Sequence, residues 1–214
     1  MKDRLLLIGA GGHCRVILDH LLQAKTYTIA GIIDVKERVG ENVLGIPIIG
    51  TDDDCSQFYK NGVRHCFISA GSIGDPILRV KLYEHSAKLE FIFPNIIHPS
   101  ALISSRASLG AGNYIAPGAI INVNAQIGDQ CIINSGAIIE HDSKLGNFVH
   151  IASGAVLSGG VKVGDHTHVG TGASVIQCLE IGARVVIGAG SVVTKNIPSG
   201  VIAYGNPSKE KRNA

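Results

Sequence analysis

The chain has 214 residues, of which 45% are hydrophobic and 17% are charged, a composition typical of a soluble globular protein. Its formal net charge of +2 is too small to favour nucleic acid or an anionic membrane as a partner. No segment approaches the roughly 18 consecutive apolar residues of a membrane span, and the first residues do not form a signal-peptide pattern.

Residues 1–94 predict a short Rossmann-like α/β unit with a parallel sheet. Short apolar segments alternate with one amphipathic segment, which is the pattern of buried strands and a covering helix. The predicted elements are strands over Leu5–Ile8, Ile29–Ile33 and Cys66–Ala70, and a helix over residues 13–23 that buries Val16, Ile17 and Leu21. Such sheets bind ligands at the carboxyl ends of their strands, so we expect the ligand site of this unit there.

The loop after the first strand nearly matches the dinucleotide-binding pattern G-x-G-x-x-G. Gly9 and Gly11 fit it, but Cys14 occupies the third glycine position. Asp34 follows at the end of the next predicted strand, where a carboxylate binds ribose hydroxyls in such folds. The unit is too short for both halves of a dinucleotide domain, so a mononucleotide or nucleotide sugar suits it better than NAD. A structural strand–turn–helix without a ligand is the alternative.

From residue 95 onward the sequence is a six-residue repeat. Every sixth residue from Ile97 to Val193 is Ile, Leu or Val, without an insertion, and Gly recurs every eighteen residues from Gly110 to Gly182. Three hexads therefore make one triangular coil of three short strands and three tight turns. The aliphatic residues are expected to stack inward at the β-ladder spacing of about 4.8 Å. This period predicts a parallel β-helix over residues 95–197, but it does not predict the handedness of that helix.

The tripeptide Glu140-His141-Asp142 lies within this repeat. His141 occupies a position at which other coils carry varied residues, so packing does not require a histidine there. A neutral imidazole near pH 7 can act as a general base, and an adjacent carboxylate can orient it. In a regular strand Asp142 would point away from His141. Either a corner breaks this alternation, or the orienting acid comes from elsewhere, for example from a neighbouring chain.

Other histidines and the cysteines carry weaker signals. His166 and His168 form an H-x-H pair that is compatible with zinc, but only Asp165 offers a further ligand at suitable spacing. We therefore expect no metal, and histidines that are solvated or face a neighbouring subunit. The five scattered cysteines form no CxxC pair, which is typical of reduced thiols in a cytoplasmic protein. The sequence contains no nucleophile motif such as G-x-S-x-G, so a covalent acyl-enzyme is not expected.

Over nearly its full length the sequence resembles the sialic acid O-acetyltransferase (NeuD) family, which includes the PglD-type N-acetyltransferases of UDP-4-amino-sugars. The resemblance rests, in chain order, on Gly9–His13, Glu140–Asp142, His150 and Gly205–Lys209. It implies a left-handed β-helix, and a homotrimer with active sites between neighbouring subunits. It also implies acetyl-CoA as the donor and a nucleotide-linked amino sugar as the acceptor.

The resemblance assigns roles to individual residues. His141 matches the general base, and Asp142 matches the acid beside it, where PglD-type enzymes carry a Glu that is one methylene longer. The positions that match the nucleotide-sugar pocket are Gly11, Gly12, His13, Asp34 and Gly71. The positions that match acetyl-CoA contacts are His150, Gly159, Thr171 and Ala189.

Residues 198–214 are expected to leave the repeat as a C-terminal loop or tail, because residues 197–209 are rich in Pro and Gly. The resemblance implies that this loop folds back near the donor, where Lys209, Lys211 and Arg212 would meet the CoA phosphates. The alternative is a disordered terminus.

The sequence as a whole predicts an acetyl-CoA-dependent N-acetyltransferase that modifies a UDP-4-amino-sugar for surface-glycan synthesis. An O-acetyltransferase of sialic acid or another sugar hydroxyl would need the same base and the same donor, so the sequence barely separates the two. A non-catalytic β-helix scaffold is the alternative of another class, and Glu140–Asp142 argues against it.

Overall fold

The computed structural model describes residues 2–213 and divides the chain into two compact units. The first, called the α/β unit here, comprises the residues up to Ser72 together with Ile77–Pro94. The second, called the prism, comprises Ile73–Pro76 and the residues from Asn95 onward. Across the described part of the chain, no helix is both long and apolar enough to cross a lipid bilayer.

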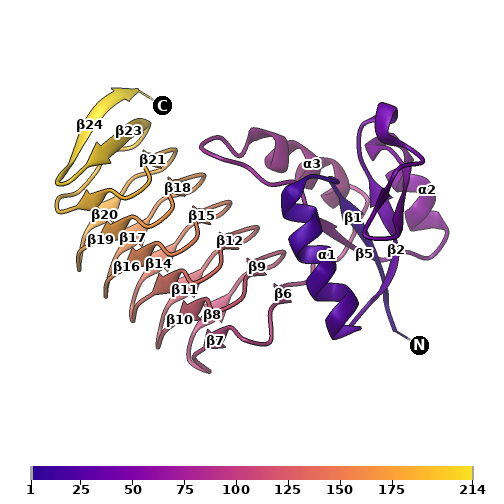
Figure 1. Cartoon of the computed structure of the whole chain (residues 1–214), viewed down its shortest axis with the longest axis horizontal. Coiled ribbons are helices and arrows are strands. Elements are labelled where there is room, and N and C mark those ends of the chain that lie inside the picture. Colours follow the sequence, from indigo (N-terminus) through magenta and orange to yellow (C-terminus); the bar gives the residue numbers. More distant parts are fainter. Residues whose placement is uncertain (1, 214) are drawn as a thin grey trace. The chain divides into compact units, whose positions relative to one another are not determined.

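A five-stranded sheet in the order β3-β4-β2-β1-β5 forms the centre of the α/β unit (Figure 1). Its strands are β1 (Arg4–Ile8), β2 (Thr28–Ile33), β3 (Asn42–Val43), β4 (Ile46–Gly50) and β5 (His65–Ile68). All neighbouring pairs are parallel except β3 and β4, which are antiparallel. The parallel sheet predicted from the sequence is therefore confirmed.

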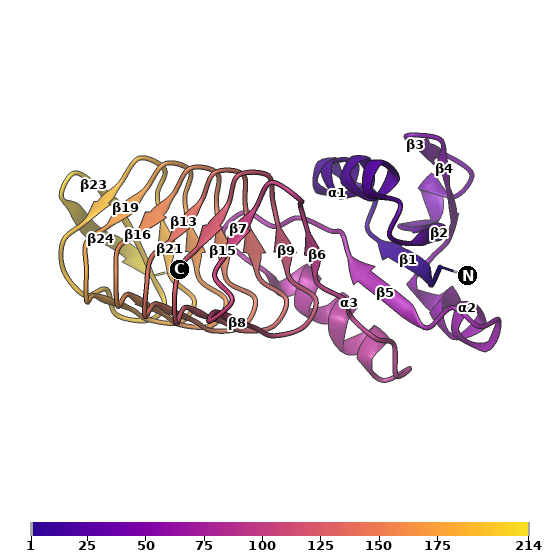
Figure 2. The same ribbon diagram turned by 90° about the horizontal axis from the view of Figure 1, so that it is seen from below.

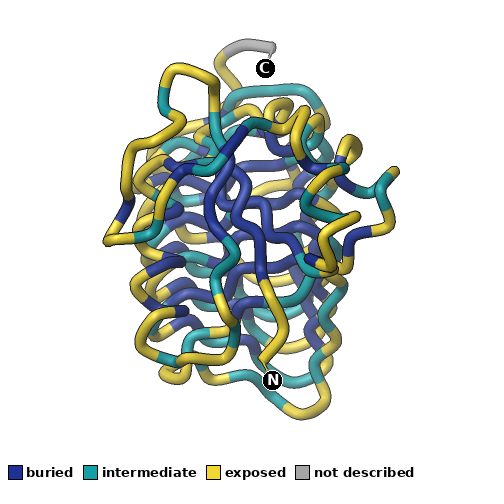
Figure 3. The backbone as a smooth tube through the Cα atoms, turned by 90° about the vertical axis from the view of Figure 1, so that its right-hand side faces the viewer, coloured by how far each residue is buried: buried dark blue, intermediate teal, exposed yellow. Residues whose placement is uncertain are grey.

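Helices cover both faces of this sheet. They are α1 (Gly12–Ala24), α2 (Cys55–Lys60) and α3 (Ile77–Ala87), and the short 3-10 helices are η1 (Lys36–Arg38) and η2 (Asp52–Asp54). Figure 2 shows α1 on one face and α2 and α3 on the other. Because successive strand residues point to opposite faces, β1 is buried on both sides. In Figure 3 the chain passes from exposed N-terminal residues into this dark-blue strand.

The buried face of α1 differs from the sequence prediction at one position. Ile17 and Leu21 are buried as expected, but Val16 is 46% exposed, so the prediction for Val16 is wrong. Cys14 and Leu18 are buried instead. Buried residues at spacings of three and four follow one helical face, and Val16 falls outside that stripe.

The prism is a parallel β-helix built from two-residue strands that stack in three sheets (Figures 1 and 2). The first sheet contains β6 (Ile96–Ile97), β9 (Tyr114–Ile115), β12 (Ile132–Ile133), β15 (His150–Ile151), β18 (His168–Val169) and β21 (Val186–Ile187). The second contains β7 (Leu102–Ile103), β10 (Ile120–Ile121), β13 (Ile138–Ile139), β16 (Val156–Leu157), β19 (Ser174–Val175) and β22 (Val192–Val193). The third contains β8 (Ser108–Leu109), β11 (Gln126–Ile127), β14 (Lys144–Leu145), β17 (Lys162–Val163) and β20 (Glu180–Ile181).

Each of these strands ends at an aliphatic position of the hexad repeat. Strands eighteen residues apart pair in register, so that Ile133 pairs with Ile151, for example. From Ile115 to Val193 every aliphatic position is buried in one continuous core. The column is less covered in the first coil, where Ile97 is 40% exposed. The triangular coil predicted from the period is confirmed.

Two different positions make the corners of the prism tight. The first is the third residue after each aliphatic position. From Gly112 to Gly190, every residue at this position has a positive φ. The glycines that recur every eighteen residues do not share this conformation. At Gly128, an added Cβ would lie only 2.6 Å from the carbonyl oxygen of Gly146 in the next coil. The eighteen-residue glycine period therefore reflects close stacking of coils at one corner.

The segment expected to be a C-terminal loop contains two strands. They are β23 (Val201–Gly205), which pairs in parallel with β21, and β24 (Ser208–Asn213), which pairs antiparallel with β23. Ala203 pairs with Ile187 and is buried in the core of the prism. The last coil is two residues shorter than the others, since this step spans sixteen residues instead of eighteen, so a strict six-residue count misses it.

Candidate active site

The loop that follows β1 is held against the neighbouring strands by its backbone. Gly9 has a φ of 101°, and an added Cβ would lie 2.7 Å from the backbone nitrogen of Ala70, so only glycine fits there. The Gly9 amide donates to the Ile33 carbonyl, and its carbonyl accepts a hydrogen bond from the Ser69 hydroxyl at 2.6 Å. These contacts fix the loop at the carboxyl ends of β1, β2 and β5.

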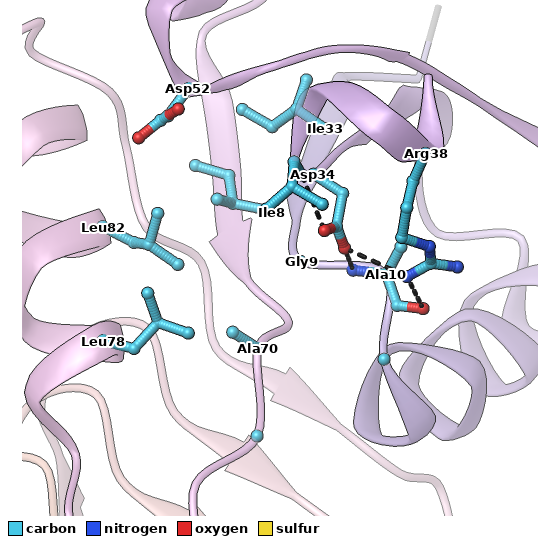
Figure 4. Close-up of a pocket in the computed structure, with 13 residues that line it drawn as sticks. Ile8, Gly9, Ala10, Ile33, Asp34, Arg38, Asp52, Ala70, Leu78 and Leu82 are labelled. Atoms are coloured by element: carbon cyan, nitrogen blue, oxygen red, sulfur yellow. Dashed lines mark hydrogen bonds and ion pairs between the residues drawn. The ribbon is translucent and has the colours of Figure 1, made fainter. Parts of the chain in front are cut away.

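The carboxylate of Asp34 is fixed beside this loop. Its Oδ2 accepts a hydrogen bond from the Ala10 amide at 2.5 Å and lies 3.3 Å from Nη1 of Arg38 (Figure 4). The same guanidinium donates to the Ala10 carbonyl at 3.1 Å. Asp34 therefore reaches the loop from the end of β2, at the edge where the sequence predicts a ligand.

A cavity of about 400 Å³ opens at this edge of the sheet. Figure 4 shows Leu78 and Leu82 of α3 across the space from Asp34 and Arg38. The lining residues are Ile8, Gly9, Ala10, Gly11, Ile33, Asp34, Val35, Arg38, Asp52, Ala70, Gly71, Leu78 and Leu82. The cavity thus combines apolar walls with a few polar groups, as small-molecule sites do.

Three of the five residues predicted to bind substrate in this unit, Gly11, Asp34 and Gly71, line the cavity, whereas Gly12 and His13 do not. His13 lies directly behind the wall, because an added Cβ on Gly71 would be 3.0 Å from the Cβ of His13. Burial, followed by the charge of Arg79, lowers the pKa of His13 to about 4. The imidazole is therefore neutral at pH 7.

In the prism, His141 and Asp142 form a tight turn between β13 and β14. Asp142 has a φ of 60°, so the chain leaves the extended conformation there and the two side chains no longer point apart. Nδ1 of His141 donates to Oδ2 of Asp142 at 2.8 Å. Of the two alternatives that the sequence left open, the structure therefore has the corner, and Asp142 itself holds the imidazole.

The imidazole of His141 lies over Gly159, which occupies the equivalent position in the next coil. An added Cβ on Gly159 would be 2.5 Å from Nε2 of His141, so a larger residue would displace the ring. Both His141 and Asp142 are 58% exposed. Hydrogen bonds from His141 and then from Asn124 lower the pKa of Asp142, which keeps it ionised. Because Nδ1 carries the proton that is donated to Asp142, Nε2 of this tautomer is the proton acceptor of the ring.

His150 and His168 lie side by side on the first sheet. They pair in register, and their rings meet edge to face with centroids 4.7 Å apart. His168 is only 7% exposed, and burial lowers its pKa. Of the two alternatives for His168, solvated or facing a neighbouring subunit, the first is therefore wrong, and the second stays a prediction. His166 sits on the preceding turn instead, with its ring against Phe148.

The remaining residues predicted to contact acetyl-CoA lie at another corner. Thr171 and Ala189 occupy equivalent turn positions of successive coils, between the first and second sheets, and both are exposed. In the tail, the Lys211 ammonium lies 5.3 Å from the centre of the Tyr204 ring, while Lys209 is exposed on β24. The side chain of Arg212 lies outside the described part of the chain.

Comparison with known proteins agrees in both units. Residues 4–86 match the model of the PglD N-terminal domain, and residues 124–159 match that of the bacterial transferase hexapeptide repeats. A histidine-to-asparagine variant of perosamine N-acetyltransferase from Caulobacter crescentus, solved with CoA and GDP-perosamine, is 37% identical with a TM-score of 0.92, covering 99% of this chain and 98% of that one. The chain belongs to the PglD-type family of hexapeptide-repeat sugar acetyltransferases.

Two further solved structures support this assignment. The acetyltransferase domain of PglB from Neisseria gonorrhoeae is 33% identical with a TM-score of 0.89, covering 98% of this chain and all of that one. WeeI from Acinetobacter baumannii is 25% identical with a TM-score of 0.87, covering 98% and 100%. No curated protein sequence matches the chain. As in the family, the β-helix of this acetyltransferase is left-handed.

Several residues of this acetyltransferase site are not evident from the sequence. Arg38, Asp52 and Leu78 line the cavity but belong to no motif. Arg79 is only 2% exposed, although charged residues are rarely buried to this extent. Arg38 follows Asp34 by four residues, a spacing that also occurs in ordinary surface turns. The sequence therefore carries no signal that Arg38 lines a cavity. Asn124 is different, since its position eighteen residues before Asp142 is readable from the repeat.

Proposed function

We propose that the chain transfers an acetyl group from acetyl-CoA to the amino group of a nucleotide-linked sugar. One observation carries the proposal: Asp142 holds the imidazole of His141 through Nδ1 at a corner of the prism, over Gly159, which leaves Nε2 of that ring to accept a proton. A similar acetyltransferase was solved with CoA and an amino-sugar nucleotide. Replacing a histidine in that enzyme by Asn or Ala left both ligands bound, as expected for a group that acts in chemistry more than in binding.

The chemistry is a direct transfer. The sugar amine attacks the thioester carbonyl and a carbon–nitrogen bond forms. The carbon–sulfur bond then breaks, and the departing sulfur takes the proton from the His141 imidazolium, so that CoA leaves as the thiol. His141 Nε2 takes the proton that the attacking amine must lose, and Asp142 stabilises the imidazolium that results. A base of this kind contributes about 10²–10⁴ in rate.

The active site of the proposed enzyme is shared between subunits. His141 lies at the corner between the second and third sheets, whereas His150 lies on the first sheet, which is the opposite side of the same coil. The two therefore reach one thioester only if they come from different copies of the chain. We propose a homotrimer in which Gly159 accompanies His141, and the neighbouring subunit supplies His150, Thr171 and Ala189 to acetyl-CoA.

The cavity of the α/β unit is the proposed nucleotide site. Its volume of about 400 Å³ falls within the range of small-molecule sites, about 300–1,000 Å³. The Asp34 carboxylate would accept hydrogen bonds from ribose hydroxyls at the strand ends, as in related nucleotide-binding folds. Gly11 and Gly71 keep the backbone close to the ligand. The sequence favoured a uridine nucleotide, and the similarity to a GDP-perosamine enzyme adds a guanosine nucleotide to the panel that must be tested.

The decisive measurement is acetyl-CoA consumption with a UDP-4-amino-sugar, a GDP-4-amino-sugar and free sialic acid. We expect turnover with one of the amino-sugar nucleotides, and a His141→Ala variant slower by about 10²–10⁴. Turnover with sialic acid alone would replace the proposal by O-acetylation. A parent protein inactive with every acceptor would favour a non-catalytic scaffold.

Mixing variants tests the shared site. His141→Ala and His150→Ala are each expected to be nearly inactive. Co-expressed in equal amounts, they are expected to recover about a quarter of the parent activity, because a quarter of the sites at random subunit interfaces would carry both histidines. Absence of recovery, or a molar mass other than that of a trimer, would contradict the shared site.

The proposal extends to the cell. The five cysteines are all free and four of them are buried, which fits a reducing compartment. We therefore propose that the enzyme works in the cytoplasm on sugar nucleotides destined for surface glycans. Deleting the gene and finding the surface glycan fully N-acetylated would contradict this role.

A further inference from the structure

The carboxylate of Asp142 has a hydrogen-bonded neighbour on each of its oxygens. Oδ2 accepts from Nδ1 of His141 at 2.8 Å, and Oδ1 accepts from the side-chain amide Nδ2 of Asn124 at 3.2 Å. Asn124 lies eighteen residues before Asp142, so the two occupy the same turn position of successive coils. Asn124, Asp142 and His141 therefore form a continuous chain of hydrogen bonds along one corner of the prism.

The backbone explains why this chain forms. Asn124 and Asp142 both adopt left-handed conformations, with φ angles of 59° and 60°. Equivalent residues of stacked coils project in the same direction at the ladder spacing of about 4.8 Å, which two short polar side chains can bridge. Gly118 and Gly136 show that glycine serves in the same conformation at other turns. The turn itself does not require an amide at residue 124.

We infer that Asn124 is a positioning residue for acetyl transfer: its amide fixes the Asp142 carboxylate in the orientation that holds the His141 imidazole over Gly159. An exposed carboxylate with a single partner would rotate about its terminal torsion, which is broad and roughly two-fold. Asn124 occupies the second oxygen and so restricts that rotation. The inference rests on the proposed function, because it takes His141 as the base.

Asn124 also borders a second cavity, which allows a competing role. This cavity of about 370 Å³ is lined by Arg106, Ser108, Asn124, Gln126, Asp142 and Lys144. If Asn124 only contacted an acceptor bound there, its loss would raise KM and leave kcat unchanged. If it positions Asp142, its loss lowers kcat and leaves KM nearly unchanged. Steady-state kinetics therefore separate the two roles.

Asn124→Gly is the cleanest variant, because glycine keeps the left-handed turn and removes only the amide. We expect kcat to fall between about 2- and 10-fold, the effect of one net hydrogen bond, with KM for both substrates within about twofold. Arg184→Gly is the matched control, since Arg184 is exposed and left-handed at another corner, with a φ of 53°. It is expected to keep the parent kcat. An Asn124→Gly variant with the parent kcat, or with a change in KM alone, would overturn the inference.

Asn124→Asp adds a readout that a structural role would not move. The new carboxylate repels Asp142 and favours the protonated forms of nearby groups. The acidic limb of the kcat/KM profile is therefore expected to move to higher pH, whereas Asn124→Gly lacks this added charge. An unchanged limb in Asn124→Asp contradicts the inference.

The tautomer of His141 tests the positioning without any turnover. Nitrogen NMR shifts of the His141 ring are expected to show predominantly Nδ1–H in the parent and a mixture of tautomers in Asn124→Gly. If the parent turns over no acceptor but the tautomer still shifts, the proposed function fails while the positioning of His141 by Asn124 stands. An unchanged ring spectrum overturns the positioning itself.

Discussion

The two units of this acetyltransferase carry their functional groups in different ways. In the prism, every coil repeats the same turns, and His141 and Asp142 simply occupy one of them. In the α/β unit, the cavity is formed by segments far apart in sequence, from the loop after β1 to helix α3. Where the fold repeats, a departure from the repeat identifies a functional residue. Where it does not repeat, only a local motif can do so.

The two units also differ in how a side chain is held. Asp142 is 58% exposed and depends on neighbours in its own corner, whereas Asp34 is 16% exposed and is fixed by a backbone amide and a guanidinium. The prism thus carries His141 and Asp142 on its surface, while the α/β unit holds Asp34 in the wall of a cavity. Substitutions that act on one unit and spare the other test this division.

The largest expected effect is on the core of the prism. Ile151→Ala removes a side chain that is fully buried in the middle of the aliphatic column, and we expect the free energy of unfolding to fall by about 2–5 kcal/mol. Ile97→Ala is the matched control from the same column, because Ile97 is 40% exposed and should cost much less. Chemical denaturation of both variants measures the difference. Equal losses would show that the coils do not share one continuous core.

The next effect belongs to the α/β unit and depends on pH. Burial lowers the pKa of His13 to about 4, below its ordinary value of 6.5. The unfolded chain therefore binds the proton more readily, so the contribution of His13 is fully present above pH 6.5 and is lost as the pH falls toward 4. The loss amounts to up to about 3 kcal/mol. Unfolding measured between pH 4 and 7 should show a weaker pH dependence in His13→Gln than in the parent.

His168 provides the comparison within the prism. Burial lowers its pKa as well, so His168→Gln is expected to remove a separate part of the pH dependence with the same sign. If the pH dependence of the parent persisted in both variants, burial of these two imidazoles would not be its cause.

The same difference explains how far the sequence could be interpreted. The period located every strand of the prism up to Val193, because each coil repeats the environment of the last. The six-residue period failed at the last coil. Because that coil is two residues shorter, Ala203 pairs with Ile187, at a position that a strict six-residue count does not reach. In the α/β unit, the glycine loop and Asp34 were found from local pattern, whereas Gly71 was assigned through the resemblance to the family. Arg38 was missed because its role depends on the Ala10 carbonyl, twenty-eight residues away.

Two glycines of the prism are expected to respond differently to alanine. At Gly164 an added Cβ would lie 2.5 Å from the backbone nitrogen of Ala183, so Gly164→Ala forces coils apart and should cost about 1–3 kcal/mol. At Gly136 nothing lies within 4 Å, and the φ of 66° alone opposes alanine, by about 1 kcal/mol. Gly136→Asn should cost less than Gly136→Ala, because Asn tolerates the left-handed region. At Gly164 Asn should cost at least as much stability as Ala. If Gly164→Asn instead cost less than Gly164→Ala, as expected at Gly136, close stacking of the coils would not be the constraint at Gly164.

The smallest expected effect on stability is at Arg38. Its substitution is expected to weaken ligand binding by the α/β unit and to leave the free energy of unfolding almost unchanged. The guanidinium is 30% exposed, and such ion pairs contribute about 0–1 kcal/mol, so Arg38→Met should change unfolding very little. Its loss removes a cation from the cavity wall, and affinity for a nucleoside diphosphate should fall by roughly 3- to 10-fold. Arg64→Met is the matched control, since Arg64 stacks on Tyr59 and does not line the cavity. Calorimetric titration with UDP and GDP compares the two. Equal affinities would mean that the phosphates lie elsewhere, and that Arg38 serves only to hold Asp34 against Ala10.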